Sequence, residues 1–357
     1  MNILILTAKY GMGHYTASMS LKQELENKNT HVEVIDFFDI IFPKMKTIIY
    51  GTFNFLVSKC SRVYNFFYKF TANTDSAPFK SIMEKRIEKL LQEKNVDIII
   101  STFPICSKYI SAYKKSNNPN LKLYTYITDI EVNKEWITNQ TDSYFVASNE
   151  TKIQMMKNGI SEENIKVVGI PVRKEFKENI NSKNKKEIVI MGGGLGLIPD
   201  IDKSIEELAQ NKDIHITLLA GKNHKIFNKY YGKYTNITVI GYTNEVYKYM
   251  KKAELIITKA GGITLFEAIH SNTPIYIVYP FLSQEIGNAK FVENKGLGKV
   301  IWKKTENAIK PIIKLLNTPV ELEIMKENMD KIKNELEPIS VIDAYKESVA
   351  KWWFYWL

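Results

Sequence analysis

The chain has 357 residues, enough for two domains that each bury a core of their own. Charged residues make up 25% and apolar residues 45%, an ordinary globular composition that argues against disorder and against a membrane-spanning class. The net charge of +10 favours an anionic partner, although the scattered lysines can also reflect composition alone.

No apolar run approaches the roughly 20 residues that a membrane-spanning helix needs. Met1-Asn2 leads directly into the strand-like run Ile3–Leu6 without a basic segment or a cleavage site. The chain is therefore expected to stay in the cytoplasm. Cys60 and Cys106 lack metal or redox spacing and are expected to be free, buried thiols.

Short β-branched, apolar runs alternate with helical patterns along the whole chain. The runs are Ile3–Leu6, Val32–Ile35, Ile98–Ile100, Leu123–Ile127, Tyr144–Ala147, Lys166–Val168, Ile188–Met191, Ile214–Leu219, Ile237–Ile240, Leu255–Ile257 and Ile275–Val278. Runs without polar alternation, separated by helices, are typical of buried parallel strands. The predicted fold class is therefore α/β, with two Rossmann-like, doubly wound parallel-sheet domains facing a central cleft.

The lysine-rich stretch Arg173–Glu187 has no strand pattern and is predicted to link the domains. The N-terminal domain is then 1–176 and the C-terminal domain 187–335. Residues 336–357 belong to a helical region and are expected to pack back on the N-terminal domain. In such folds ligands bind beyond the carboxyl ends of the strands.

Two polar motifs follow strands in the first half. Gly11-Met12-Gly13-His14 comes after the first strand, and its imidazole can accept a proton from an attacking hydroxyl if its pKa is near the working pH. A capping role at the start of the next helix, Thr16–Leu25, is the alternative. Thr128-Asp129 ends another predicted strand, and Asp129 is the second candidate for a proton acceptor.

Residues 40–74 include no acidic residue, and their basic side chains are interleaved with aromatic ones. An apolar stripe with basic flanks can lie in the headgroup region of an anionic membrane. The predicted membrane and acceptor contacts are Gly13, Phe53, Lys59, Arg62, Phe66 and Phe67. A core helix packed on the first sheet is the alternative. The aromatic chain end, 351–357, also suits an interface, or could fold back onto the cleft.

Three glycine-containing turns follow strands in the second half. The glycines at 192–196, including Gly193 and Gly194, allow close approach of a phosphate, or form a tight turn. Tyr242 and Thr243 stand after a later strand. Gly261-Gly262 then opens a helix, so its free N–H groups and positive dipole end form an anion site suited to a diphosphate.

The order of these motifs resembles the inverting glycosyltransferases of the two-Rossmann, GT-B type. The matching segments are Gly11–His14, Ser101–Pro104, Thr128-Asp129 with Trp136, Gly169–Arg173, the glycines at 192–196, Gly241-Tyr242, Ala260–Ala268 and Gln284–Asn288. The resemblance is closest to the monogalactosyldiacylglycerol synthases and processive diacylglycerol glucosyltransferases of glycosyltransferase family 28. It is more distant to the N-acetylglucosaminyltransferase that makes lipid II.

This resemblance implies a UDP-sugar donor site in the second half. Its diphosphate would bind at Lys259, Gly261, Gly262, Ile263 and Thr264, its ribose at Glu267, its uracil at Tyr242 and Thr243, and its sugar at Gln284 and Asn288. Two positions depart from the family pattern: Asn133 stands where a histidine is usual, and Ser283 where a glycine is usual. If that histidine is the family's base, His14 or Asp129 must serve here.

The resemblance implies transfer of a hexose from UDP-glucose or UDP-galactose to diacylglycerol, with inversion, at the inner face of the cell membrane. Other lipid-linked acceptors, such as a polyprenyl-linked saccharide, and a catalytically inactive nucleotide-sugar-binding protein are alternatives. No side-chain cluster has metal-ligand spacing, so no metal and no other cofactor is expected. A nucleic-acid partner is not expected either, because it leaves the Gly-Gly helix and Glu267 unexplained.

Overall fold

The computed structural model describes residues 1–9, 12–41, 80–178, 186–194, 196, 201–303 and 309–354. These residues form two compact units, Met1–Arg173 with Glu335–Leu357, and Lys174–Asn334. The predicted membrane contacts Phe53, Lys59, Arg62, Phe66 and Phe67, and the side chains of the aromatic chain end, lie outside the described residues.

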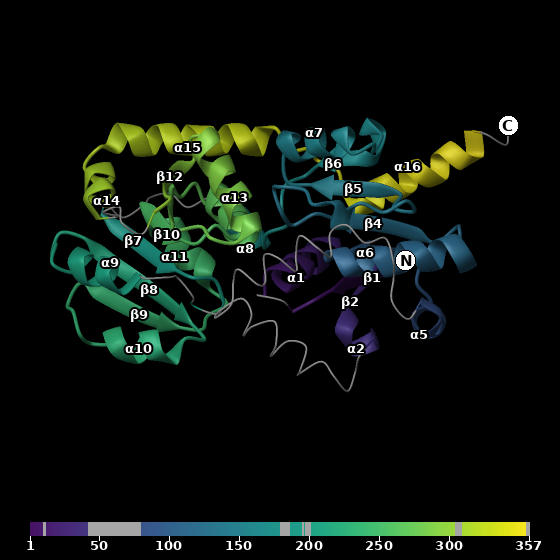
Figure 1. The fold of residues 1–357 in the computed structure, drawn as a ribbon, viewed down its shortest axis with the longest axis horizontal. Helices are drawn as coiled ribbons and strands as arrows, with labels where there is room; N and C mark the ends of the chain where they lie inside the picture. The colour runs from purple at the N-terminus through teal and green to yellow at the C-terminus, as the bar shows by residue number, and fades with distance from the viewer. Residues whose placement is uncertain are drawn as a thin grey trace. The chain divides into compact units, whose positions relative to one another are not determined.

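A six-stranded parallel sheet forms the centre of the first unit (Figure 1). Its strands are β1 (Asn2–Thr7), β2 (His31–Asp36), β3 (Ile98–Ser101), β4 (Lys122–Tyr126), β5 (Ser143–Val146) and β6 (Ile165–Val167), in the order β2-β1-β3-β4-β5-β6. All six match predicted apolar runs. Their side chains are largely buried, as expected of parallel strands covered on both faces.

Helices cover both faces of this sheet. They are α1 (Gly13–Leu25), α2 (Phe37–Ile41), α5 (Lys80–Lys94), α6 (Pro104–Asn117), α7 (Asn149–Lys157) and α16 (Val341–Phe354), with short 3-10 turns η1 (Lys134–Trp136) and η2 (Glu162–Asn164). Leu4 and Leu6 pack against α2, α5 and α6. Ile3 and Ile5 point to the other face, where α1 and α16 contribute Leu21 and Val341. The alternation along β1 thus divides the core into two layers.

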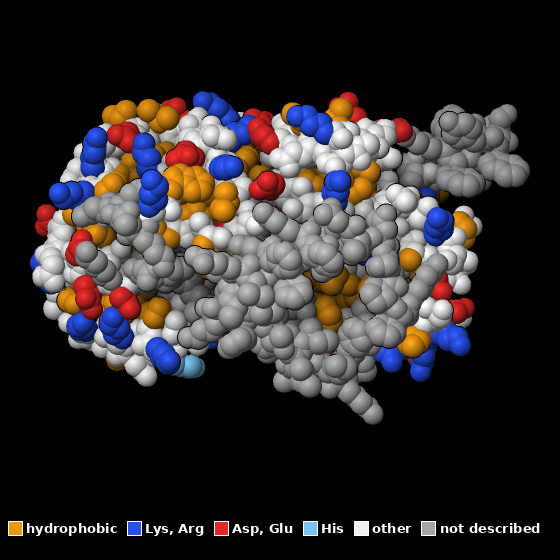
Figure 2. Space-filling view, viewed as in Figure 1, with side chains coloured by type: hydrophobic (Ala, Val, Ile, Leu, Met, Phe, Trp, Pro, Cys, Tyr) orange, Lys and Arg blue, Asp and Glu red, His pale blue; other side chains and the backbone are white. Residues whose placement is uncertain are grey.

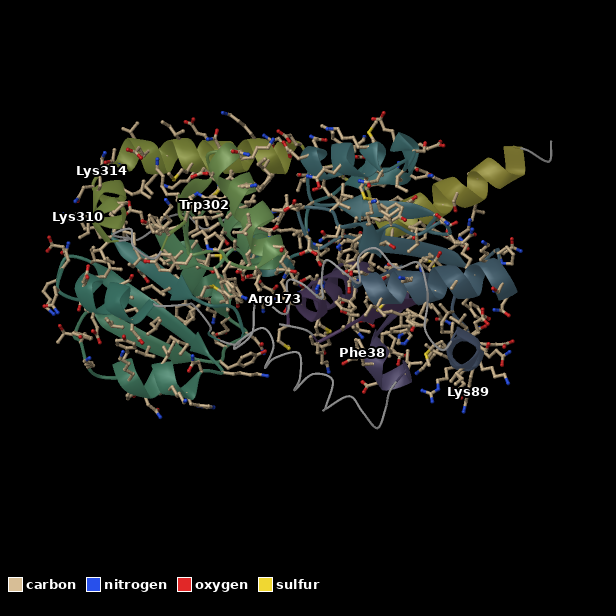
Figure 3. All side chains as sticks on the ribbon, in the orientation of Figure 1. Phe38, Lys89, Arg173, Trp302, Lys310 and Lys314 are labelled. Atoms are coloured by element: carbon tan, nitrogen blue, oxygen red, sulfur yellow. The ribbon has the colours of Figure 1, made fainter. Side chains whose placement is uncertain are left out.

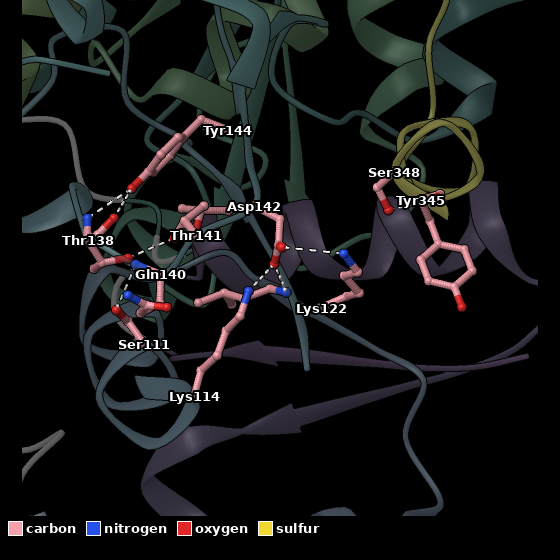
Figure 4. Close-up of polar contacts among 12 residues, drawn as sticks. Ser111, Lys114, Lys122, Thr138, Gln140, Thr141, Asp142, Tyr144, Tyr345 and Ser348 are labelled. Atoms are coloured by element: carbon pink, nitrogen blue, oxygen red, sulfur yellow. Dashed lines mark hydrogen bonds and ion pairs between the residues drawn. The ribbon is translucent and has the colours of Figure 1, made fainter. Parts of the chain in front are cut away.

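A buried ion pair fastens α6 to the start of β4 (Figure 4). The carboxylate of Asp142 pairs with the ammonium group of Lys114, whose side chain is 6% exposed, and lies 3.7 Å from the Nζ of Lys122. It also accepts the backbone N–H of Leu123 at 2.8 Å. Asp142 therefore compensates a buried cation and holds the start of β4.

Replacing Asp142 by Asn should lower the free energy of unfolding by roughly 2 to 4 kcal/mol, because the buried ammonium of Lys114 loses its counterion. Urea unfolding at neutral pH measures this. Glu162→Gln is the matched control, since its pair with Lys152 involves a carboxylate that is 65% exposed. A loss no larger than that of the control would contradict the buried role of Asp142.

The second unit contains another six-stranded parallel sheet. Its strands are β7 (Glu187–Met191), β8 (His215–Gly221), β9 (Ile237–Gly241), β10 (Leu255–Thr258), β11 (Ile275–Val278) and β12 (Gly298–Ile301), in the order β12-β11-β10-β7-β8-β9. Five match predicted runs, and β12 was not predicted. A Cβ at Gly298 would lie 1.8 Å from the carbonyl oxygen of Ile275, so this edge strand requires a glycine, which is not a strand signal in a sequence.

The helices of this unit are α8 (Lys174–Lys177), α9 (Ile201–Leu208), α10 (His224–Tyr230), α11 (Val246–Lys252), α12 (Gly262–His270), α13 (Ser283–Asn294), α14 (Ile309–Leu316) and α15 (Pro319–Asn334). Helix α14 is amphipathic and packs with its apolar face on the core. Ile312 and Leu315 are buried there, whereas Lys310 and Lys314 are exposed (Figure 3). On the face shown in Figure 2, basic and acidic side chains are interspersed rather than segregated.

Strand order determines where each unit can bind a ligand. In the first sheet the order reverses between β1 and β3, and in the second between β10 and β7. At such a reversal the helices leave the sheet on opposite faces, and ligands bind beyond the carboxyl ends of the two strands. His14 follows β1, and Gly261-Gly262 follows β10, so both predicted motifs stand at reversal points.

Candidate active site

His14 lies in the first turn of α1, beyond the end of β1. Its Nδ1 is 2.7 Å from the hydroxyl oxygen of Thr128, which follows β4. The ring packs edge-on against Phe103 at 5.0 Å and lies 6.1 Å from Trp136. Although part of its surface is exposed, these neighbours dominate its environment, and burial lowers the pKa of His14 to about 4, with the Thr102 carbonyl opposing the shift. The imidazole is therefore neutral between pH 5 and 8.

Asp129 is 9% exposed and accepts the indole N–H of Trp136 at 3.3 Å. Burial raises the pKa of Asp129 to about 6; the hydrogen bond from Trp136 lowers it in part, and Glu135 adds to the increase. Above that pH the group is a carboxylate that is more basic than an ordinary aspartate. Asp129 is consequently a stronger proton acceptor at neutral pH than His14.

Buried hydroxyl groups hold the start of α1 in place. Ser18 donates to the backbone carbonyl of His14 at 2.8 Å, and its oxygen is 2.8 Å from the hydroxyl of Thr102. Thr102 in turn donates to the hydroxyl of Thr7 at 2.9 Å. Thr7 ends β1 and Thr102 follows β3, so the network joins the two strands at the reversal point to the helix that carries His14. Thr7 and Ser18 carry no motif in the sequence that would predict these roles.

The two pKa shifts have opposite effects on stability. The lowered pKa of His14 stabilises the fold above pH 6.5, and this contribution is lost as the pH falls toward 4. The raised pKa of Asp129 stabilises the fold below about pH 4, and this contribution is lost as the pH rises through 6. At neutral pH the ionised Asp129 therefore costs the folded state up to about 3 kcal/mol.

Replacing Asp129 by Asn should remove this cost while keeping an acceptor for Trp136. We expect the free energy of unfolding to rise by roughly 1 to 3 kcal/mol at pH 8 and by about a third of that amount at pH 4.5, where the folded state keeps Asp129 protonated. Urea unfolding at the two pH values measures the difference, with the exposed Glu131→Gln as control. An equal change at both pH values would show that ionisation of the buried Asp129 does not destabilise the fold.

In the second unit, α12 begins in a turn of small residues. Gly261 is the N-cap, and no side-chain hydrogen bond caps the helix among the described residues. The first helical backbone bond runs from the N–H of Leu265 to the carbonyl of Gly261, so the N–H groups of Gly262, Ile263 and Thr264 have no acceptor within the helix. These amides and the helix dipole are the features on which the predicted anion site depends.

The glycine turn after β7 lies next to this site. β7 and β10 are neighbours, with Met191 in register with Thr258. A Cβ at Gly193 would lie 3.9 Å from the Cε of Lys259, so the lysine side chain passes over the glycine turn. Gly194 accepts the N–H of Lys222 at 3.1 Å. The structure therefore brings Gly193, Lys259 and the start of α12 together.

The remaining predicted donor residues occupy different settings. Glu267 is 7% exposed on α12, whereas Tyr242 is 54% exposed, with the Nζ of Lys222 5.3 Å from its ring centroid. Thr243 accepts the N–H of Glu245 at 3.0 Å. The side chain of Asn288 is 1% exposed and donates to the carbonyl of Ala260 at 2.9 Å, fixing α13 to the turn. Gln284 is half-buried in the first turn of α13.

Within the described parts of the chain, no group of three His, Cys, Asp or Glu side chains could hold a metal ion. The helices described there include none long and apolar enough to span a bilayer. Cys106 is a free, buried thiol, as predicted, and Cys60 lies outside the described residues.

Comparison of the fold with solved structures identifies its class. The chain matches MurG of Acinetobacter baumannii with a TM-score of 0.60 at 15% identity, covering 94% of this chain and 96% of that one. Two Rossmann-like parallel-sheet units are the architecture of the GT-B fold, as the sequence predicts.

Comparison of the sequence identifies the family. Residues 14–172 match the family described as monogalactosyldiacylglycerol (MGDG) synthase, and residues 187–340 match the glycosyltransferase family 28 C-terminal domain. Processive diacylglycerol beta-glucosyltransferase of Bacillus cereus is 31% identical, over 96% of this chain and 92% of the relative. The Staphylococcus aureus protein of that name is 30% identical, over 94% and 90%. The chain therefore belongs to the monogalactosyldiacylglycerol synthase and processive diacylglycerol glucosyltransferase family.

Proposed function

We propose that this enzyme transfers a hexose from a UDP-sugar to the hydroxyl of diacylglycerol, with inversion at the anomeric carbon. Family membership supports the acceptor, because its relatives carry the name diacylglycerol beta-glucosyltransferase. The single structural observation that carries the proposal is the open start of α12, which stands beside Lys259 and the glycine turn. This site suits the diphosphate of a nucleotide sugar.

In this mechanism the acceptor hydroxyl attacks the anomeric carbon in a single displacement. A base removes the hydroxyl proton, a new glycosidic bond forms, and the bond to the diphosphate breaks with UDP as the leaving group. The amides at the start of α12 and the ammonium of Lys259 stabilise the negative charge that develops on the leaving phosphate. Well-placed donors of this kind lower the barrier by roughly 3 to 4 kcal/mol each.

Asp129 is the base in this proposal, and His14 binds the acceptor hydroxyl. The carboxylate of Asp129, with its pKa near 6, is ionised at neutral pH and more basic than the imidazole of His14, with its pKa near 4. The pairing of His14 Nδ1 with the hydroxyl of Thr128 fixes the ring next to the segment that carries Asp129. Asp129 also explains how the chain functions with Asn133 in place of the usual histidine.

The acceptor is a membrane lipid, so we place the enzyme at the cytoplasmic surface of the membrane as a peripheral protein. The basic, aromatic segment 40–74 supports this placement by its composition. UDP-glucose is the favoured donor because the relatives are named glucosyltransferases, and UDP-galactose is the second candidate. Glu267 would bind the ribose, and Gln284 the transferred sugar.

The test is a donor and acceptor screen with the full chain. Labelled UDP-glucose and UDP-galactose are each incubated with diacylglycerol in anionic vesicles, and glycolipid and UDP are measured together. We expect one molecule of UDP to be released for each glycosidic bond formed. Product with a polyprenyl-linked saccharide but not with diacylglycerol would correct the acceptor, and UDP binding without any turnover would indicate a nucleotide-sugar-binding protein.

A further inference from the structure

Glu285, in the first turn of α13, has no role in the mechanism described so far, yet it contacts the proposed diphosphate site. Its Oε1 is 3.5 Å from the Nζ of Lys259, and its side chain is 4% exposed. Its other oxygen, Oε2, lies 3.5 Å from the backbone nitrogens of Phe281 and Leu282 at the start of α13. A buried carboxylate thus stands beside the cation that the mechanism assigns to the leaving group.

Burial makes this contact electrostatically significant. A carboxylate withdrawn from water needs compensating charge or hydrogen bonds, and Lys259 supplies the charge. The Lys259 side chain is 34% exposed, so it keeps access to solvent while it pairs with Glu285. The bond from Asn288 to the carbonyl of Ala260 fixes α13 to the turn, which keeps the carboxylate close to the lysine.

A diphosphate bound at the start of α12 would need the same ammonium group. It carries more negative charge than one carboxylate, so it can attract Lys259 away from Glu285, but only against the energy of the existing pair. The carboxylate would then be left buried beside a bound anion, with less compensation than before.

We propose that Glu285 competes with the diphosphate for Lys259 and so weakens the binding of UDP, which promotes release of this product after transfer. The inference rests on the proposed function, because it assumes that UDP binds at α12. It assigns Glu285 a positioning role that acts through Lys259.

The experiment measures UDP binding to the full-length protein by calorimetry at constant ionic strength. Glu285→Gln keeps the shape of the side chain and removes its charge, and we expect UDP to bind roughly tenfold more tightly. Product inhibition by UDP should strengthen by a similar factor. Glu293→Gln, which removes an exposed charge from the same helix, is the matched control and should leave UDP affinity unchanged.

A double variant separates competition for Lys259 from simple repulsion between carboxylate and phosphate. If Glu285 acts through the lysine, the gain from Glu285→Gln should fall below twofold in a Lys259→Met background. A gain that persists there would overturn the inference. Glu285→Ala provides a second neutral variant, and thermal unfolding confirms that each protein is folded.

The remaining outcomes are also decisive. If the wild-type protein binds UDP and both neutral variants bind it equally well or more weakly, the inference is refuted. The proposed function would still stand. Weaker binding of UDP-hexose with unchanged binding of UDP would make Glu285 a sugar ligand and also refute it. If the wild-type protein does not bind UDP at all, the proposed function fails, and this inference fails with it.

Discussion

Replacing Asp129 by Asn should lower kcat by about 10²- to 10⁴-fold, because the amide cannot take the proton of the acceptor hydroxyl. The KM for the nucleotide sugar should change less than about threefold, since the proposed donor residues belong to the second unit and Asp129 to the first. Steady-state kinetics with diacylglycerol vesicles measures both values. The expected gain in stability at pH 8 separates a lost base from a damaged fold.

The pH profile of the wild-type enzyme identifies the base independently. With Asp129 as base, kcat should fall on the acid side with an apparent pKa near 6, whereas His14 as base would place the acid limb near 4. His14→Gln should reduce kcat less than Asp129→Asn does. Glu131→Gln serves as the control for a nearby exposed carboxylate. Full activity of Asp129→Asn would exclude Asp129 as the base.

Replacing Glu267 by Ala should weaken UDP binding by roughly 10- to 100-fold. This carboxylate is 7% exposed on α12, and the proposal gives it the two ribose hydroxyls. Hydrogen bonds to a charged group contribute about 1.5 to 3 kcal/mol, and their loss accounts for this range. Calorimetric titration with UDP measures the change, and thermal unfolding monitors the fold.

Two comparisons sharpen the Glu267 experiment. Uracil and inorganic pyrophosphate should bind the Glu267→Ala variant with the same affinity as the wild-type protein, because neither probe has ribose hydroxyls. Glu327→Ala on α15 removes an exposed carboxylate from the same unit and should bind UDP normally. Equal loss of affinity for pyrophosphate and for UDP would argue that Glu267 supports the structure of α12 instead of binding the ribose.

The fold could be predicted from sequence because its strands are buried on both faces. The run Ile188–Met191 is apolar at every position, which is the pattern of a central parallel strand, and β7 is such a strand. β12 was missed because it is an edge strand with one exposed lysine, Lys299, and a glycine that only the close approach of Ile275 explains. Such approaches depend on neighbours distant in sequence, which periodicity does not record.

The candidate site was likewise predicted only in part from the sequence. His14 and the Gly-Gly helix were predicted because each follows an apolar run, and the strand ends place them at the two reversal points. The hydroxyl network of Thr7, Ser18 and Thr102 was not predicted, since its members come from separate elements and none is unusual alone. Asp129 could be preferred to His14 as the base only from the structure, because burial raises the pKa of the carboxyl and lowers the pKa of the imidazole.

The most direct test of the central claim is a crystal structure of the full chain with UDP bound. We expect the diphosphate at the N–H groups of residues 262–264 beside Lys259, with the ribose hydroxyls at the carboxylate of Glu267. UDP bound elsewhere on the second unit, or on the first unit alone, would contradict the account.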